Sequence, residues 1–162
     1  MRCMTPTLDQ EISIFSYSDA FYDDLCQLII ELQDYESKFN ADRAEGKLVF
    51  KEYVQELLDD VHANQGDILM AKLDNAVVGC IAFFYEKDVL NKEGHIYISD
   101  LVVSEKARNQ GIAQRLMEKV EEIAEEKKLA LRVGVLANSP SAKFYEKMGF
   151  EVEVLELVKK VS

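Results

Sequence analysis

The sequence has no tryptophan, two prolines and few residues of the kinds that hold metals or crosslinks. Its three cysteines, Cys3, Cys26 and Cys80, are widely spaced and odd in number, so neither a disulfide framework nor a zinc site is predicted. The two histidines, His62 and His95, belong to no HExxH or other clustered ligand pattern. We therefore expect free thiols and no catalytic metal.

Long apolar runs are also missing. No stretch approaches the roughly 18 apolar residues of a membrane span, and the opening MRCMTPTLDQ lacks the apolar segment of a signal peptide. No repeat or Pro/Gly-rich linker divides the 162 residues. We expect a cytoplasmic protein that does not bind membranes, with an N-terminal tail over residues 1–10 and one domain over residues 11–162.

Basic residues are outnumbered, 19 against 30 acidic ones, for a net charge of -11. The excess is uneven, because residues 11–67 carry fourteen acidic and four basic side chains. This distribution argues against a nucleic-acid partner and favours a cationic one. A merely solvated helical surface explains it equally well.

Hydrophobic periodicity predicts an α/β protein with a mixed sheet, in the order β α α β β β α β α β. Strands are expected at 11–17, on both sides of a turn at Asp74-Asn75, at 95–103, at 129–136 and at 150–158. Helices are expected after an N-cap at Ser18, over 47–66, from Gly111, and after Ser139 with Pro140 in the first position.

The stretch ARNQGIAQRLM, residues 107–117, joins a strand to a helix through small residues. Helix N-terminal amides attract anions, and Gly111 and Ala113 would let a pyrophosphate approach the backbone. Arg108 could add a charge-assisted contact. With one glycine and no GK[ST], the pattern is neither a Rossmann fingerprint nor a P-loop. Taken alone, an ordinary strand-to-helix turn with an exposed arginine explains it as well.

A second motif follows at a fixed separation. SDLVVSEKARNQGIAQRLM and, about twenty residues on, LRVGVLANSPSAKFYEKMGFE together resemble the GNAT superfamily of N-acetyltransferases. The matching residues are Arg108, Gly111, Ala113, Asn138, Phe144, Tyr145, Gly149 and Phe150. The resemblance implies a mixed, mostly antiparallel sheet with a central splayed pair of parallel strands, flanked by helices. It makes residues 11–162 a single N-acetyltransferase domain.

The resemblance further implies that strands 95–103 and 129–136 separate at their C-terminal ends and admit the pantetheine arm of acetyl-CoA. Backbone groups of Leu101 and Val103 would pair with pantetheine, amides of 109–114 would hold the pyrophosphate, and Asn138 would fix the arm unless it is an ordinary turn residue. The cofactor-binding residues implied are Leu101, Val102, Val103, Arg108, Asn109, Gln110, Gly111, Ile112, Ala113, Gln114 and Asn138.

The implied reaction moves an acetyl group from acetyl-CoA to a primary amine by direct attack, through a tetrahedral intermediate. A main-chain N–H near Leu101 or Val102 would stabilise the oxyanion. Tyr145 would be the general acid for the leaving thiolate; the alternative is a packing role beside Phe144 and Met148. A noncatalytic acyl-CoA-binding or sensing domain is the rival function.

The general base is less clear from the sequence. Several family members carry a glutamate on the strand before the pyrophosphate loop, where this chain has Ser99-Asp100. Strand alternation predicts that these two side chains face opposite sides, so a water-mediated route to Glu86 or Tyr97 is favoured unless Asp100 points inward. His95 is more typical of a surface or packing histidine.

The acceptor side is implied to lie at the first two helices and their connection, which carry most of the negative charge. Asp34, Glu36 and Asp100 are the expected substrate-binding residues, and the expected acceptor is a cationic small-molecule amine or basic peptide. The alternating stretch 150–158 could form an exposed edge strand and so allows a homodimer.

Overall fold

The computed structural model describes residues 11–87 and 89–162, so the predicted tail 1–10 and Cys3 lie outside the described part. Within it, no helix is both long and apolar enough to cross a membrane. The elements in chain order are β1 Ile12–Ser16, the 3-10 turn η1 Asp19–Phe21, α1 Tyr22–Ser37, α2 Gly46–Ala63, β2 Asp67–Leu73, β3 Ala76–Glu86, β4 His95–Val103, the 3-10 turn η2 Glu105–Ala107, α3 Ile112–Lys127, β5 Ala130–Val133 and α4 Ser141–Lys147.

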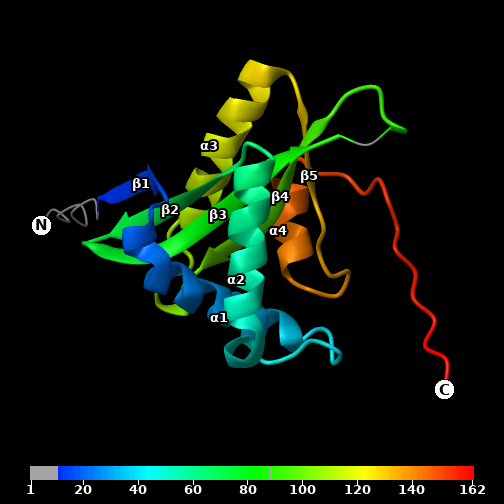
Figure 1. Ribbon diagram of the computed structural model, residues 1–162, viewed down its shortest axis with the longest axis horizontal. Helices are drawn as coiled ribbons and strands as arrows, with labels where there is room; N and C mark the ends of the chain where they lie inside the picture. The colour runs from blue at the N-terminus through cyan, green and yellow to red at the C-terminus, as the bar shows by residue number, and fades with distance from the viewer. Residues whose placement is uncertain (1–10, 88) are drawn as a thin grey trace, which may run out of the picture.

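The strands form one sheet in the order β1-β2-β3-β4-β5. The first four strands are antiparallel, and β5 joins β4 in parallel after the crossover through α3. Helices α1 and α2 cover one face of the sheet and α3 and α4 the other (Figure 1). The predicted mixed, mostly antiparallel sheet flanked by helices is confirmed.

Each face of the sheet has its own apolar core. Under α3 the buried stripe is Ile112, Leu116, Met117, Val120 and Ala124. On the other face, Leu25, Leu28 and Ile29 of α1 pack with Val54 and Leu57 of α2. In each helix these residues recur three and four positions apart, which places them on one face.

The predicted last strand is wrong. Residues 151–162 form no helix or strand, and their large apolar side chains are exposed. Alternating apolar residues predict an extended backbone, but they do not provide a second strand to pair with. A β-strand forms only where its backbone is hydrogen-bonded to a neighbouring strand. Strand β5 is also shorter than expected, ending at Val133.

Two predicted helix starts move by a few residues. At the first, a 3-10 turn intervenes between Ser18 and α1. At the last, α4 starts at Ser141, and the Ser139 hydroxyl accepts a hydrogen bond from the Ser141 amide at 3.2 Å. The N-cap residue is therefore Pro140 and not Ser139 as predicted, although the Ser139 hydroxyl still bonds to the first helical amide.

Candidate active site

The two parallel strands are paired over only the first part of β4. β5 pairs with β4 from His95/Ala130 to Ile98/Val133, but β4 continues to Val103. Beyond Ile98, its described strand neighbour is β3 alone. The predicted splayed pair is therefore confirmed, and it leaves one backbone edge of the second half of β4 open.

A bulge at Ser99 changes the direction of the side chains at this point. Ala82 pairs with Asp100 and Phe83 with Ile98, so Ser99 is the extra residue on β4. Before the bulge, Ile98 faces the α3 core, whereas after it Val102 faces the α1/α2 core. The expectation that simple alternation separates Ser99 from Asp100 is wrong, because a bulge interrupts the two-residue period.

Asp100 is turned inward, on the α1/α2 side, and is 6% exposed. The Tyr53 hydroxyl of α2 donates to its two carboxylate oxygens, at 2.8 and 2.9 Å. Tyr53 was not predicted as a functional residue. Tyr53 and Val54 recur at helical spacing with the other apolar residues of α2, so the sequence pattern indicates a packing role. The signal for a further role is that a tyrosine carries a hydroxyl, which needs a hydrogen-bond partner when the residue is buried.

Burial raises the pKa of the Asp100 carboxyl from 3.8 to about 6. Hydrogen bonds from Tyr53 and Ser99 lower the pKa, the charge of Glu36 raises it, and the charge of Arg43 lowers it. The pKa of Tyr53 is raised by burial and by Asp100. At neutral pH the pair is therefore a carboxylate held by a protonated phenol, with a pKa suited to accepting a proton.

Tyr145 lies on α4, 9% exposed, with its ring between two other aromatic residues of the second motif. Its ring makes edge-on contacts with Phe144, at 5.3 Å between centroids, and with Phe150, at 5.5 Å. Burial raises the pKa of the Tyr145 phenol, and the charges of Glu36 and Asp100 raise it further. The ring thus makes packing contacts, as expected if Tyr145 has a packing role, and the charges of two carboxylates raise the pKa of its hydroxyl.

Tyr97 is a further tyrosine of β4 that the charge of Asp100 affects. Its ring packs against Phe84 at 5.7 Å between centroids, and a Cβ placed on Gly134, just after β5, would be 3.4 Å from its hydroxyl. Burial raises the pKa of Tyr97, as do the charges of Glu86 and Asp100. The Tyr97 hydroxyl thus reaches the point where β5 ends.

The loop before α3 presents unpaired amides. Asn109 and Gly111 have φ values of 64° and 75°, and Gly111 is the N-cap without a side-chain capping bond. The Gly111 carbonyl accepts the first helical bond, from Arg115, so the amides of Ile112 to Gln114 lack helical partners. A Cβ on Gly111 would meet nothing within 4 Å. The space around Gly111 is therefore open, and the binding of an anion by this loop stays a prediction.

Arg108 and Asn138, also predicted to bind the cofactor, bond to neighbouring loops. Arg108 Nε donates to the Val103 carbonyl at 3.1 Å, and its guanidinium lies over the Tyr35 ring at 5.1 Å. Asn138 Nδ2 donates to the Phe39 carbonyl at 3.1 Å. The roles of Arg108, Val103 and Asn138 in cofactor binding stay predictions.

The two acidic residues predicted at the acceptor side occupy different positions. Asp34 Oδ1 accepts a 2.7 Å bond from the Gly46 amide and so holds the start of α2. Glu36 instead forms an ion pair with Arg43, at 3.1 Å, and its charge raises the pKa of Asp100. Asp34 is thus bonded to the start of α2 and Glu36 influences Asp100, and substrate binding by either residue stays a prediction.

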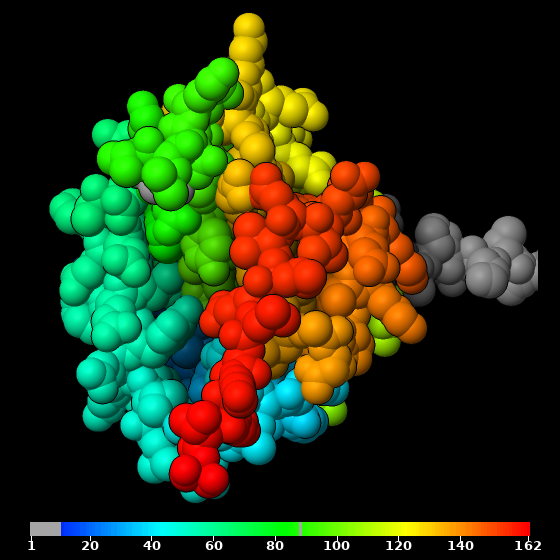
Figure 2. Space-filling model, turned by 90° about the vertical axis from the view of Figure 1, so that its right-hand side faces the viewer, coloured from blue at the N-terminus to red at the C-terminus, as the bar shows by residue number. Residues whose placement is uncertain are grey.

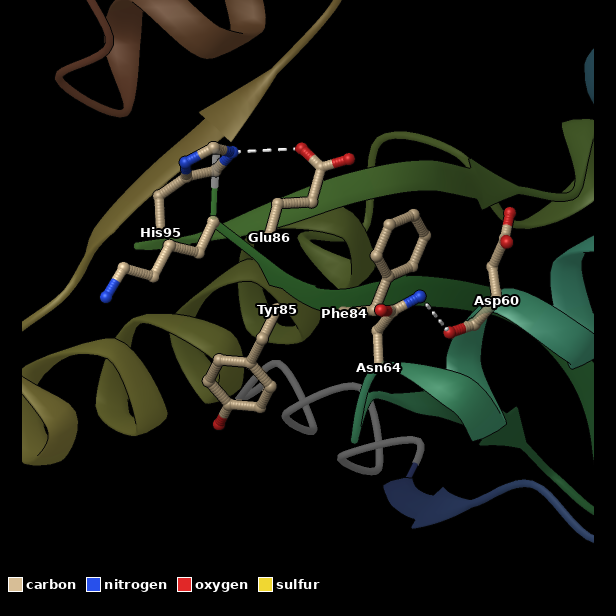
Figure 3. A pocket seen from close by; sticks show the side chains of 7 residues that line it. Asp60, Asn64, Phe84, Tyr85, Glu86 and His95 are labelled. Carbon is tan, nitrogen blue, oxygen red and sulfur yellow. Dashed lines mark hydrogen bonds and ion pairs between the residues drawn. The ribbon is translucent and has the colours of Figure 1, made fainter. Parts of the chain in front are cut away.

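The other candidate bases lie at the far end of β4. His95 Nε2 and Glu86 Oε1 are 3.0 Å apart beside a pocket of about 420 Å³ that Asp60 and Asn64 also line (Figure 3). Tyr85 points to the other side of the strand (Figure 3). Within residues 11–87 and 89–162 no cluster of three or more His, Cys, Asp or Glu could hold a metal ion.

Solved structures share this architecture. A four-site mutant of the BH1408 protein from Bacillus halodurans has a TM-score of 0.78 at 17% identity, covering 92% of this chain and 99% of its own. An aminoglycoside acetyltransferase from an uncultured soil metagenomic sample has a TM-score of 0.64 at 23% identity, covering 94% and 99%. A ribosomal-protein-alanine N-acetyltransferase from Brucella melitensis biovar Abortus 2308 gives 0.70 at 18%, covering 94% and 100%.

At these identities the structures show a shared fold alone. None of the curated proteins compared with the sequence matched it. A family model, described as the acetyltransferase (GNAT) family, matches residues 16–150 and so includes the splayed strands, the α3 loop and α4. The chain therefore belongs to the GNAT family of N-acetyltransferases.

Proposed function

We propose that this enzyme transfers the acetyl group of acetyl-CoA to a primary amine of a cationic acceptor. The observation that carries the proposal is the buried Asp100 carboxylate, held by the Tyr53 hydroxyl at 2.8 and 2.9 Å beside the splayed strands. A fixed carboxylate with a pKa of about 6 can take a proton from an incoming ammonium ion. A solvated surface aspartate could do so only weakly.

The residues at the splay fit a CoA thioester, which supplies an activated acetyl group when bound. The open edge of β4 after Ile98 offers main-chain groups to the pantetheine amides, as a neighbouring strand would. The unpaired amides after Gly111 and the positive end of the α3 dipole suit a pyrophosphate. Leu101 to Val103 and Asn109 to Gln114 are the proposed contacts.

Three groups of this chain handle charge and protons. Asp100 accepts the proton of the amine, directly or through one water molecule. A main-chain amide at Leu101 or Val102 donates to the developing oxyanion. Tyr145, kept protonated by its raised pKa, donates to the thiolate as it leaves. The two groups therefore have the protonation states that the reaction needs at pH 7, because Asp100 is charged and Tyr145 is neutral.

The acceptor is proposed to be cationic because the site carries net negative charge. The charges of Glu36 and Asp100 both raise the pKa of Tyr145, and residues 11–67 hold fourteen acids against four bases. Two structures of this fold bear names that specify amine acceptors, an aminoglycoside and a ribosomal-protein alanine. Both acceptor classes belong in the test panel.

The test is an acetyl-transfer assay on the purified chain with acetyl-CoA and a panel of amines, measured by mass spectrometry of the acceptor. The panel should contain polyamines, aminoglycosides and basic peptides, together with neutral and acidic amines of similar size. We expect turnover with cationic acceptors, weakening with added salt. Preference for acidic or neutral acceptors would contradict the proposed acceptor class, and the absence of turnover with any amine would contradict the proposed reaction.

Substituting Gly111 should weaken acetyl-CoA binding more than it weakens the fold. Gly111→Ala forces a left-handed alanine, which costs about 1 kcal/mol, and places a Cβ where the pyrophosphate would approach. We expect Kd for CoA to rise about tenfold by calorimetry. Gly149→Ala is the matched control, since Gly149 also has a positive φ, 93°, and open space around it, but lies at the end of α4. Equal effects of the two changes on Kd would rule out this role for Gly111.

Neutralising Glu36 should affect cationic acceptors selectively. We expect Glu36→Gln to raise KM for a polyamine several-fold at low salt, with little change for a neutral amine, because one unit of negative charge is removed beside Asp100. The difference should shrink at high salt. Glu126→Gln, an exposed acid near the end of α3, is the control and should leave both values unchanged.

A further inference from the structure

The pocket beside His95 lies at the opposite end of β4 from the proposed thioester site. Its volume is about 420 Å³, within the range of small-molecule sites. The last turns of α2, the end of β3 and the start of β4 line it. The open edge of β4 begins only after Ile98, so an amine in this pocket is not the one that reacts.

Two carboxylates and an aromatic ring line this pocket. Asp60 and Glu86 outnumber the one ammonium group there, that of Lys87, which is exposed. The Glu86 side chain is 45% exposed and so stays accessible, while its partner His95 is 11% exposed. In Figure 3 the Phe84 ring stands between Glu86 and Asp60. Carboxylates beside an aromatic ring attract an alkylammonium ion, so the pocket suits a cation on an apolar stem.

One line of side chains on α2 connects the pocket to Asp100. Because an α-helix turns by about 100° per residue, Tyr53, Asp60 and Asn64 lie within about 20° of one another around its axis. Tyr53 donates to Asp100, whereas Asp60 and Asn64 line the pocket about 10 Å or more further along the helix. The Asn64 carbonyl accepts a 3.1 Å bond from the Tyr85 amide, which fixes this end of α2 on β3.

Strand β4 makes the same connection across the sheet. His95 and Tyr97 point to the face opposite Ile98, which packs in the α3 core. Simple alternation would turn Asp100 into that core, but the bulge at Ser99 brings it to the face of Tyr97 and His95. Along the strand, His95 and Asp100 are about 15 Å apart. The reacting site and the pocket therefore lie on one face of the sheet.

Two aromatic side chains occupy the stretch between these ends. Tyr97 packs on Phe84, at 5.7 Å between ring centroids, and Phe84 also lines the pocket. The charges of Glu86 and Asp100 both raise the pKa of Tyr97, so its phenol is within electrostatic reach of a carboxylate at either end. In Figure 2 the green residues of β3 and β4 are recessed between α2 and residues 151–162. The line is acidic at its ends and aromatic in the middle.

We propose that the pocket binds the distal ammonium group of a linear polyamine whose terminal amine is acetylated beside Asp100. This inference rests on the proposed function, because it extends the same acceptor site. Asp60 and Glu86 attract the distal ammonium, while Tyr97 and Phe84 contact the methylene chain. The helix and strand spacings separate the two ends by about 10 to 15 Å, which an extended polyamine spans and a short diamine does not.

An unbranched chain of methylene groups and cations matches this order of side chains. An aminoglycoside would instead place polar rings where the aromatic side chains lie. The pocket thus distinguishes among the cationic acceptors by the length of the chain between their amines.

The experiment compares acceptors of different length at saturating acetyl-CoA and low salt. The native chain should have a lower KM for spermine than for putrescine or propylamine, because spermine alone reaches the pocket. We expect Asp60→Asn combined with Glu86→Gln to raise KM for spermine about tenfold, since both carboxylates that attract the distal ammonium are neutralised. The kcat for spermine and the KM for propylamine should change less than about twofold, because the pocket takes no part in the chemical step.

Asp59→Asn is the matched control. Asp59 is exposed and adjacent to Asp60 on α2, and its carboxylate accepts a 2.9 Å bond from Gln55 outside the pocket. The change removes one charge from a position about 100° around the helix and should leave KM for spermine unchanged. Circular dichroism of every variant should match the native spectrum, since the changed side chains contact solvent.

Calorimetry of spermine binding in the presence of CoA separates the site from the reaction, because binding needs no turnover. Turnover of spermine with the same KM and Kd in the native chain and the double variant would overturn the distal site and leave the reaction standing. If no amine is acetylated, the proposed function fails, and a weaker Kd for spermine in the double variant would still support the site. A double variant that loses a basic peptide but keeps spermine would overturn the polyamine assignment.

Discussion

Asp100→Asn is expected to lower kcat by about 100-fold or more at pH 8, with a much smaller effect on Kd for CoA. General-base catalysis typically contributes on the order of 100- to 10,000-fold, and asparagine keeps the size of aspartate but cannot take up a proton. In the native enzyme, kcat/KM should fall as pH drops through about 6, because protonation of Asp100 removes the base. Steady-state kinetics from pH 5 to 9 would show both effects.

Asp100→Asn should not destabilise the fold. A stability measurement therefore distinguishes the loss of a catalytic group from a loss of structure. The pKa of Asp100 is about 6 when folded and near 3.8 when unfolded, so ionised Asp100 lowers the free energy of unfolding. That cost is absent below pH 3.8, grows as pH rises to 6 and reaches about 3 kcal/mol at pH 7. We expect Asp100→Asn to be at least as resistant to urea as the native chain at pH 7. Lost activity with a loss of stability would instead indicate a structural role.

Tyr53→Phe provides the companion measurement for that base. It leaves the carboxylate in place but removes the hydroxyl whose hydrogen bond lowers the pKa of Asp100. The acid limb of the pH profile should therefore move to higher pH, with a loss of activity near pH 6 that is partly recovered at pH 8. An unchanged pH profile would contradict the assignment of Asp100 as the titrating group.

The parts of the site that the sequence predicted are those whose geometry is set locally. The α3 loop depends on a glycine at positive φ before a helix, and the aromatic contacts of Tyr145 come from residues within five positions. Such features are determined by short-range backbone and side-chain chemistry, so a motif of fixed spacing identifies them. The family fold follows because the two motifs occur at a fixed separation.

The Asp100–Tyr53 pair depends on structural features that a short sequence pattern does not predict. A bulge at Ser99 changes which face of the sheet the following β4 side chains point to. The hydroxyl that binds Asp100 belongs to Tyr53, which lies 47 residues earlier on a helix. Asp34 and Glu36 show the same limit, since these two acids lie two positions apart in α1, yet one binds the start of α2 and the other forms an ion pair. Which acid faces the site is decided by tertiary packing, and composition predicts only that the region is acidic.

The second large effect is expected at Tyr145. Tyr145→Phe should lower kcat by about 100-fold while Kd for CoA changes less than twofold, because the phenyl ring keeps both aromatic contacts and loses only the proton donor. The pKa of Tyr145 lies above its ordinary value of 10, so no falling limb due to this residue should appear below about pH 10 in the native enzyme. Thermal unfolding should be nearly unchanged.

Tyr85→Phe is the control for removing a phenol elsewhere on the sheet. Tyr85 packs on the α3 side, with the Lys127 ammonium 5.3 Å from its ring centroid, and its hydroxyl has no part in the proposed chemistry. Its loss should leave kcat within about twofold. If Tyr145→Phe also stays within twofold, the residue packs and does not donate, and the thiolate must take its proton from solvent. Since burial and two carboxylates keep the phenol protonated where the thiolate would form, we expect the larger loss.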